Sequence, residues 1–163
     1  GVIMDKDTKV KVISTVLGGI TVSLPNLSWI REWPRKGAAV MVPFGILEEG
    51  MYDTGFGNML RDGDLYIEDM AVKRELGLEP DEAKEPENII ILTDNKMLYL
   101  MKTASLEELR STLSKVSIEQ ANNLAQYAIE NEYNNLDKAE IIKERTGIDI
   151  IKSILLERAN KEK

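Results

Sequence analysis

The stretch Glu79-Pro80-Asp81-Glu82-Ala83-Lys84-Glu85-Pro86-Glu87 decides how the chain is organised. It holds five acids and two prolines but no large apolar side chain. Proline does not sustain a helix interior, and like charges at short spacing repel one another. We therefore predict a solvated connector that divides the chain near residue 85, giving a module at residues 1–85 and a second at residues 86–163.

The segment before the connector is rich in strand-forming residues. Residues 9–17 and 20–24 contain many β-branched side chains and are separated by Gly18-Gly19, a pair suited to the positive φ angles of a hairpin turn. This pattern predicts a β-hairpin. Residues 27–33 alternate between apolar and polar positions, and residues 38–42 are apolar, so each predicts a further strand.

Short helices and turns are expected from Pro43 onward. Pro43 suits the first turn of a short helix, because the amide hydrogen that it lacks would have no partner there. Residues 52–57 indicate a loop, residues 64–67 a strand, and residues 68–76 a helix that ends at Gly77. The first module is thus predicted to be a small mixed sheet with short helices.

Helix signals dominate after the connector, although residues 88–92 also fit a buried strand or a linker. Ser105 with Glu108 and Ser117 with Gln120 match capping boxes, in which the serine accepts from the third helical amide and the Glu or Gln reaches back. Thr93 or Asp94 fits a cap of an earlier helix, and Asp137 with Glu140 is a weaker capping signal.

Apolar stripes and one glycine complete the prediction for the second module. Gly147 is expected to end one helix and separate it from the next. Two stripes recur at helical spacing: Ile118, Ala121, Leu124, Ala125, Ala128 and Ile129 form the first, and Ile148, Ile151 and Leu155 the second. The sequence therefore predicts an α+β protein that ends in a bundle of four or five helices.

The composition limits the chemistry. The chain has 163 residues, 21 basic and 28 acidic side chains, a net charge of −7, no histidine and no cysteine. These absences exclude a histidine base, a thiolate nucleophile, a zinc site of nitrogen and sulfur ligands, and a disulfide. No apolar stretch approaches the roughly 20 residues of a membrane-spanning helix. We expect a cytoplasmic protein with no catalytic residue, cofactor, metal or membrane partner.

Four acidic residues near Gly63 allow two interpretations. Asp62, Asp64, Glu68 and Asp69 surround Gly63, and such carboxylates could converge on a hard cation. Apolar residues 65–67, however, occupy the place where a calcium loop needs ligands. We therefore favour a turn followed by a helix cap over a metal-dependent enzyme.

Aromatic and basic residues interleave between residues 29 and 37. Trp29 and Trp33 lie four apart on the predicted strand, so both point to the same face. Core packing explains this spacing most simply, and a protein contact is the second interpretation. Stacking on single-stranded nucleic acid is the third, which the net charge of −7 opposes.

The protein-contact interpretation selects a wider group of side chains. Trp, Tyr, Met and Arg are enriched at interface cores, and residues 29–66 contain both tryptophans and both phenylalanines. The five glycines at positions 45, 50, 55, 57 and 63 favour an irregular backbone, which leaves apolar side chains to share with a partner. The candidate contact residues are Trp29, Arg31, Trp33, Phe44, Met51, Tyr52 and Phe56.

Five short motifs stand out: residues 31–37 (REWPRKG), 42–44 (VPF), 52–55 (YDTG), 63–70 (GDLYIEDM) and 76–80 (LGLEP). They resemble those of small proteins encoded among the virion genes of phages and prophages of Gram-positive bacteria. The similarity covers roughly residues 8–150. It implies a role in the head, connector or tail, and it carries no catalytic residue.

The sequence leaves two main functional hypotheses. The first is a non-enzymatic virion or assembly component that binds other virion proteins or its own copies and becomes incorporated in the particle. The alternative is a small regulatory or nucleic-acid-associated adaptor whose C-terminal helices are the recognition module. Residues 101–163 carry 10 bases and 11 acids, and this near-neutral charge opposes direct nucleic-acid binding by that module but permits a protein partner.

Overall fold

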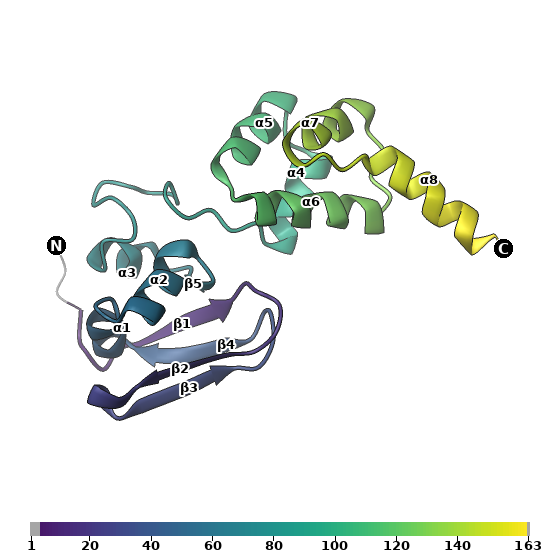
Figure 1. The fold of residues 1–163 in the computed structure, drawn as a ribbon. Coiled ribbons are helices and arrows are strands. Elements are labelled where there is room, and N and C mark those ends of the chain that lie inside the picture. Colours follow the sequence, from purple (N-terminus) through teal and green to yellow (C-terminus); the bar gives the residue numbers. More distant parts are fainter. Residues whose placement is uncertain (1–3, 163) are drawn as a thin grey trace. The chain divides into compact units, whose positions relative to one another are not determined.

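The computed structural model describes residues 4–162 and divides into two compact units, residues 1–90 and 91–163 (Figure 1). Strands and short helices build the first unit, and the described part of the second unit consists of helices and loops. The α+β class is therefore confirmed. The junction between the units lies at Ile90 and Ile91.

Strand β1 (Lys9–Ser14) is the centre of a three-stranded sheet in the order β4-β1-β5. It pairs antiparallel with β4 (Ala39–Pro43) on one side and with β5 (Leu65–Ile67) on the other. Val10 and Val12 alternate with exposed residues and are buried, as expected for a strand with one face in the core.

A second, two-stranded sheet is a hairpin of β2 (Ile20–Leu24) and β3 (Trp29–Trp33). The two strands are connected through a 3₁₀ turn at Pro25–Leu27, and Leu24 lies opposite Trp29. All these pairings are antiparallel rather than mixed. The predicted hairpin of residues 9–17 with residues 20–24 is wrong, because β2 pairs with β3.

Occupied strand edges explain that correction. Thr15, the first residue after β1, donates from its hydroxyl to Gly63 O at 2.6 Å and from its amide to Asp64 O at 2.9 Å. On the other edge, Gly37 N donates to Ser14 O at 2.8 Å. Both edges of β1 are thus paired with β5 and β4, so β2 has no edge of β1 to join.

Three short helices accompany the sheets: α1 (Phe44–Gly50), α2 (Thr54–Asp62) and α3 (Met70–Glu75). Pro43 is the cap residue of α1, in agreement with the predicted start. The loop predicted at residues 52–57 is wrong beyond Asp53, because Asp53 Oδ1 accepts from Phe56 N at 2.9 Å and starts α2.

Two glycines are needed for close packing and do not make this region irregular. A Cβ at Gly57 would lie 2.6 Å from Met51 O and 2.8 Å from Arg61 Nη1. A Cβ at Gly50 would lie 2.5 Å from the ring of Phe56. Four of the five glycines lie in helices α1 and α2, so the irregular backbone expected there is wrong; the fifth, Gly63, follows α2 in the left-handed conformation.

Five helices form the described part of the second unit: α4 (Asp94–Lys102), α5 (Leu106–Lys115), α6 (Ile118–Glu130), α7 (Leu136–Thr146) and α8 (Ile150–Lys161). Thr93, Ser105 and Ser117 cap α4, α5 and α6 as predicted. The cap of α7 is Asn135 instead of Asp137, since Asn135 Oδ1 accepts from Lys138 N at 3.0 Å.

Helix α7 holds two other helices through its cations. Lys138 Nζ donates to Leu100 O at 2.8 Å and Met101 O at 3.0 Å, in the last turn of α4. Arg145 donates to Leu113 O at 3.1 Å and Val116 O at 3.2 Å, at the end of α5. Cations at helix C-termini satisfy carbonyls that have no partner within the helix.

The two predicted apolar stripes have different outcomes. On α6 the stripe is buried except for Ile118, which is 49% exposed. On α8 the prediction is wrong, because Ile150 and Ile154 are buried while Leu155 is exposed. The sequence of α8 has apolar residues on adjacent faces, so its spacing alone did not identify the buried one.

Candidate functional site

Three aromatic members of the predicted contact group, Trp29, Trp33 and Phe56, form a cluster in the core of the first unit. The ring centroid of Trp29 lies 6.0 Å from that of Phe56 and 6.5 Å from that of Trp33. Trp33, Phe44 and Phe56 are at most 3% exposed, and Trp29 is 8% exposed. These four side chains are therefore covered by their own unit.

The two tryptophans differ in their polar atoms. Trp33 Nε1 donates to Val12 O at 3.0 Å, which ties the β2–β3 hairpin to the central strand β1. Trp29 Nε1 is buried, and the described residues offer it no hydrogen-bond partner. Trp33 thus contributes a specific bond as well as apolar area, whereas Trp29 contributes ring contacts.

The remaining predicted contact residues lie at the surface of this unit. Arg31 is exposed and places its guanidinium 5.7 Å from the ring centroid of Trp29. Tyr52 is 87% exposed beside the half-buried Met51. Tyr52 also lines a hollow of about 290 Å³, together with Leu24, Pro25, Asn26, Leu27, Glu49 and Asp53. Tyr52 thus shares this hollow with residues that do not belong to the predicted contact group.

Of the acidic residues at 62–69, Asp69 caps a helix and Asp62 lies at the end of another. Asp69 Oδ1 accepts from Ala71 N at 2.9 Å and Val72 N at 3.3 Å, which caps α3. Asp62 is the last residue of α2, before the left-handed Gly63. Within residues 4–162, no three acidic side chains gather closely enough to hold a metal ion.

A buried lysine in the first unit was missed by the sequence analysis. Lys73 is 1% exposed, and its Nζ donates to the Tyr66 hydroxyl at 3.2 Å. Burial lowers the pKa of the Lys73 amine and raises the pKa of the Tyr66 phenol, in spite of the nearby Glu79 carboxylate that favours the charged amine. With so little exposure, the amine is enclosed and not open to a substrate from solution.

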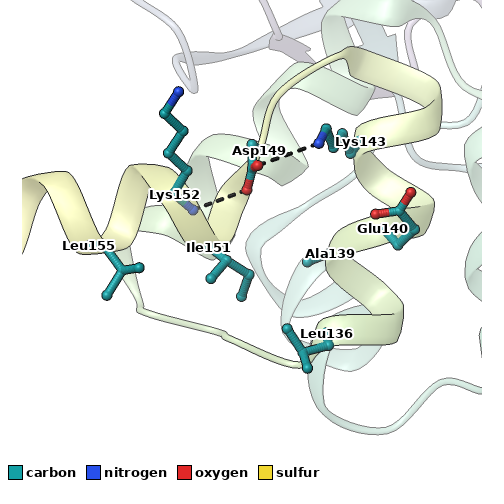
Figure 2. A pocket seen from close by; sticks show the side chains of 8 residues that line it. All are labelled: Leu136, Ala139, Glu140, Lys143, Asp149, Ile151, Lys152 and Leu155. Atoms are coloured by element: carbon teal, nitrogen blue, oxygen red, sulfur yellow. Dashed lines mark hydrogen bonds and ion pairs between the residues drawn. The ribbon is translucent and has the colours of Figure 1, made fainter.

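The second unit carries a surface groove that the sequence analysis did not predict. Figure 2 shows the side chains that line a hollow of about 360 Å³ between α7 and α8. We name this hollow the α7–α8 groove; its residues are Leu136, Ala139, Glu140, Lys143, Asp149, Ile151, Lys152 and Leu155. Leu136 is 73% exposed and Leu155 is 58% exposed.

Asp149 positions α8 at one end of this groove. Its Oδ1 accepts from Lys152 N at 3.0 Å, and its Oδ2 lies 3.4 Å from Lys143 Nζ on α7 (Figure 2). The Lys152 amide and, to a lesser degree, the Lys143 ammonium hold the pKa of the Asp149 carboxyl below its usual value. The same side chain therefore caps α8 and links it to α7.

The sequence does not reveal this groove, because the spacing predicts a buried stripe that contains Ile151 and Leu155 and no such stripe for Leu136 at the start of α7. Because Ile150 and Ile154 fill the core instead, Ile151 and Leu155 turn toward the groove.

Comparison with known proteins adds no relative. The chain matches no model of a protein family, no curated protein and no solved structure.

Within residues 4–162, no helix combines the length and the apolar character that crossing a bilayer requires.

Proposed function

We propose that this protein is a non-enzymatic component of phage virion assembly that binds a partner protein through the α7–α8 groove. The observation that carries the proposal is the exposure of Leu136 and Leu155 on the same hollow, at 73% and 58%. Contiguous apolar surface with a polar border is typical of protein-binding sites.

The groove chemistry favours a helix of a partner protein with an apolar face. Leu136, Ala139, Ile151 and Leu155 supply apolar surface to a hollow that runs between two helices. An amphipathic helix fills such a groove with side chains spaced three or four residues apart. The four charged lining residues are two acids and two lysines, so their charges cancel and give no attraction to a polyanion.

The assembly role comes from the resemblance of the sequence motifs to virion-gene proteins. In a virion each protein is repeated by symmetry, so one modest groove per chain is multiplied over many copies. The buried aromatic cluster of the first unit then serves as a scaffold, and its exposed Arg31 and Tyr52 are additional candidates for contact.

The adaptor alternative is favoured by one observation, the position of the groove in the helical unit. An adaptor of this kind would use α7 and α8 as its recognition module. It differs from the assembly component in its partner: a regulatory protein in place of a virion subunit.

A photo-crosslinking amino acid tests the groove in the cells that produce the protein. Placed at position 155, it should give a discrete adduct with a second protein chain. Position 156 is the matched control, because Leu156 is 56% exposed on the same helix and does not line the groove. Leu136→Asp should remove the adduct from position 155.

The outcomes separate the hypotheses. A virion subunit in the adduct supports the assembly role, and so does an adduct between copies of this chain within a particle. A regulatory protein supports the adaptor. An adduct with nucleic acid, or equal adducts from positions 155 and 156, contradicts the proposal that the α7–α8 groove binds a partner protein. Turnover of a substrate by the purified protein, abolished by replacing one carboxylate, contradicts the non-enzymatic role.

A further inference from the structure

The acidic stretch before the junction contains one buried carboxylate. Glu79 is 2% exposed, although the sequence pattern predicts that this stretch is solvated. Its Oε2 accepts from Glu87 N at 2.8 Å and from Asn88 N at 2.9 Å, and its Oε1 accepts from Ile89 N at 3.0 Å. One side chain thus holds three consecutive backbone amides, so the prediction of a solvated connector is wrong at this residue.

Other bonds fold the intervening residues back onto the first unit. Asn88 Nδ2 donates to Leu78 O at 2.9 Å, and Arg74 on α3 donates from Nη1 to Ala83 O at 2.8 Å. Ala83 is 4% exposed. The stretch between Glu79 and Ile89 is therefore a closed loop whose two ends meet at the Glu79 carboxylate.

A side chain of the second unit holds the chain just beyond the junction. Gln120, on α6, is 7% exposed, and its Oε1 accepts from Leu92 N at 3.0 Å. In a capping box this side chain would reach back to the amide of Ser117, but here it holds a residue 28 positions away. Leu92 itself is 6% exposed.

These two contacts leave a very short free segment. Ile89 is held by Glu79 in the first unit and Leu92 by Gln120 in the second, so only Ile90 and Ile91 lie between the held residues. Three Cα–Cα steps span at most about 11 Å. Both free residues are β-branched and therefore restricted in conformation.

We propose that Glu79 and Gln120 act as a pair of clamps that shorten the link between the two units to Ile90 and Ile91. The acidic loop is then a segment that could lengthen the link, and the Glu79 clamp keeps it folded. Opening this clamp, together with the Asn88–Leu78 and Arg74–Ala83 bonds, would free ten residues, 80–89, and would add up to about 35 Å to the extended length of the link. The clamps therefore limit how far apart the two units move, with or without a bound partner.

The chain lacks cysteine, so two introduced cysteines can be spin-labelled without interference. Leu17→Cys in the first unit and Lys115→Cys in the second, both exposed, report the distance between units. Glu79→Gln keeps the shape of the side chain but replaces one carboxylate oxygen with an NH2 group, which cannot accept a hydrogen bond from the backbone N–H groups. Glu82→Gln is the matched control, an exposed residue with the same charge change in the same loop.

In E79Q we expect hydrogen exchange at amides 87–89 to become at least tenfold faster and the distance distribution to broaden. E82Q should leave both unchanged. Slow exchange at amides 87–89 in E79Q would overturn the claim that Glu79 holds these amides. Fast exchange with an unchanged distance distribution would overturn the claim that the Glu79 contact limits the length of the link.

An insertion separates this result from a loss of folding. Gly-Ser placed between Ile90 and Ile91 lengthens the link while both clamps remain closed. We expect a broader distance distribution, slow exchange at amides 87–89 and an unchanged circular dichroism spectrum. An unchanged distribution would overturn the proposal even if E79Q did not fold. None of these readouts depends on the partner bound by the α7–α8 groove.

Discussion

Individual residues in this protein are constrained by close contacts that their own type does not reveal. Gly55 and Gly57 lie in the same helix, α2, two positions apart. A Cβ at Gly57 would lie 2.6 Å from Met51 O, whereas the nearest atom to a Cβ at Gly55 is Asp53 Oδ1 at 3.5 Å. The same residue type thus has a packing role at one position and none at the other.

Substitution by alanine should separate these two glycines. Gly57→Ala forces the Met51 carbonyl and the Arg61 side chain away from the new methyl group, so we expect a loss of about 1–3 kcal/mol in the free energy of unfolding. Gly55→Ala meets ordinary contacts and gains helix propensity, with a change between zero and about 1 kcal/mol in the stabilising direction. Urea unfolding measures both, and equal effects would contradict the packing role.

Asp149 gives a prediction for acid pH. Its pKa is lower in the folded chain than in the unfolded chain, so the stabilisation is present above its ordinary value of 3.8 and is lost as the pH falls through the folded value. Asp149→Asn still caps α8 but carries no charge. We expect the variant to lose less stability than the wild type between pH 5 and pH 2, which are about the limits of this titration.

The control for this titration is Glu157→Gln, which removes one exposed carboxylate from the same helix without touching Asp149. Thermal unfolding at a series of pH values measures both variants. The prediction fails if the two profiles coincide.

At the scale of elements, α7 organises the second unit through its cations. Lys138 bonds the end of α4 and Arg145 bonds the end of α5. Burial without a carboxylate partner lowers the pKa of the Lys138 amine, so the carbonyl groups of α4 are what hold the cation. Helix packing and helix capping are thus combined in one side chain.

Lys138→Met tests this combination. The methionine keeps the apolar stem but leaves two buried carbonyls of α4 without their donor, so we expect a loss of about 1–3 kcal/mol in the free energy of unfolding. Lys143→Met on the same helix is the control, because the side chain of Lys143 is 49% exposed and its ion pair with Asp149 contributes little. Guanidinium unfolding followed by circular dichroism compares them, and equal losses would contradict the capping role.

Local signals predicted most elements but not how they associate. The caps at Thr93, Ser105 and Ser117 involve bonds within three residues, so they can be recognised from the sequence. The pairing of β1 depends on Thr15 and Gly63, which are 48 positions apart. The candidate groove depends on which face of α8 packs against its neighbours, and two adjacent faces of that helix are apolar.

At the scale of the whole molecule, the chain passes from one unit to the other at residues 90 and 91, and not near residue 85 as predicted. Residues after 85 still belong to the first unit through Glu79. A fragment that ends at residue 85 lacks the three amides that satisfy this carboxylate. A fragment of residues 1–90 retains them.

We therefore expect the 1–90 fragment to be more stable than the 1–85 fragment by about 3 kcal/mol, the scale of hydrogen bonds to a charged group. Urea unfolding of both fragments measures the difference. Introducing Glu79→Gln into both should reduce it. Equal stability of the two unsubstituted fragments would contradict a structural role for residues 86–90.

The amino-acid sequence by itself determined the α+β class, the positions of most helices and strands, and the absence of histidine and cysteine chemistry. These properties depend on composition and on bonds between residues a few positions apart. Only the tertiary structure decided the partners of β1, the burial of Glu79 and Lys73, and the face of α8 that lines a groove. Each depends on contacts between distant parts of the chain, where several apolar faces or polar partners compete and packing selects one.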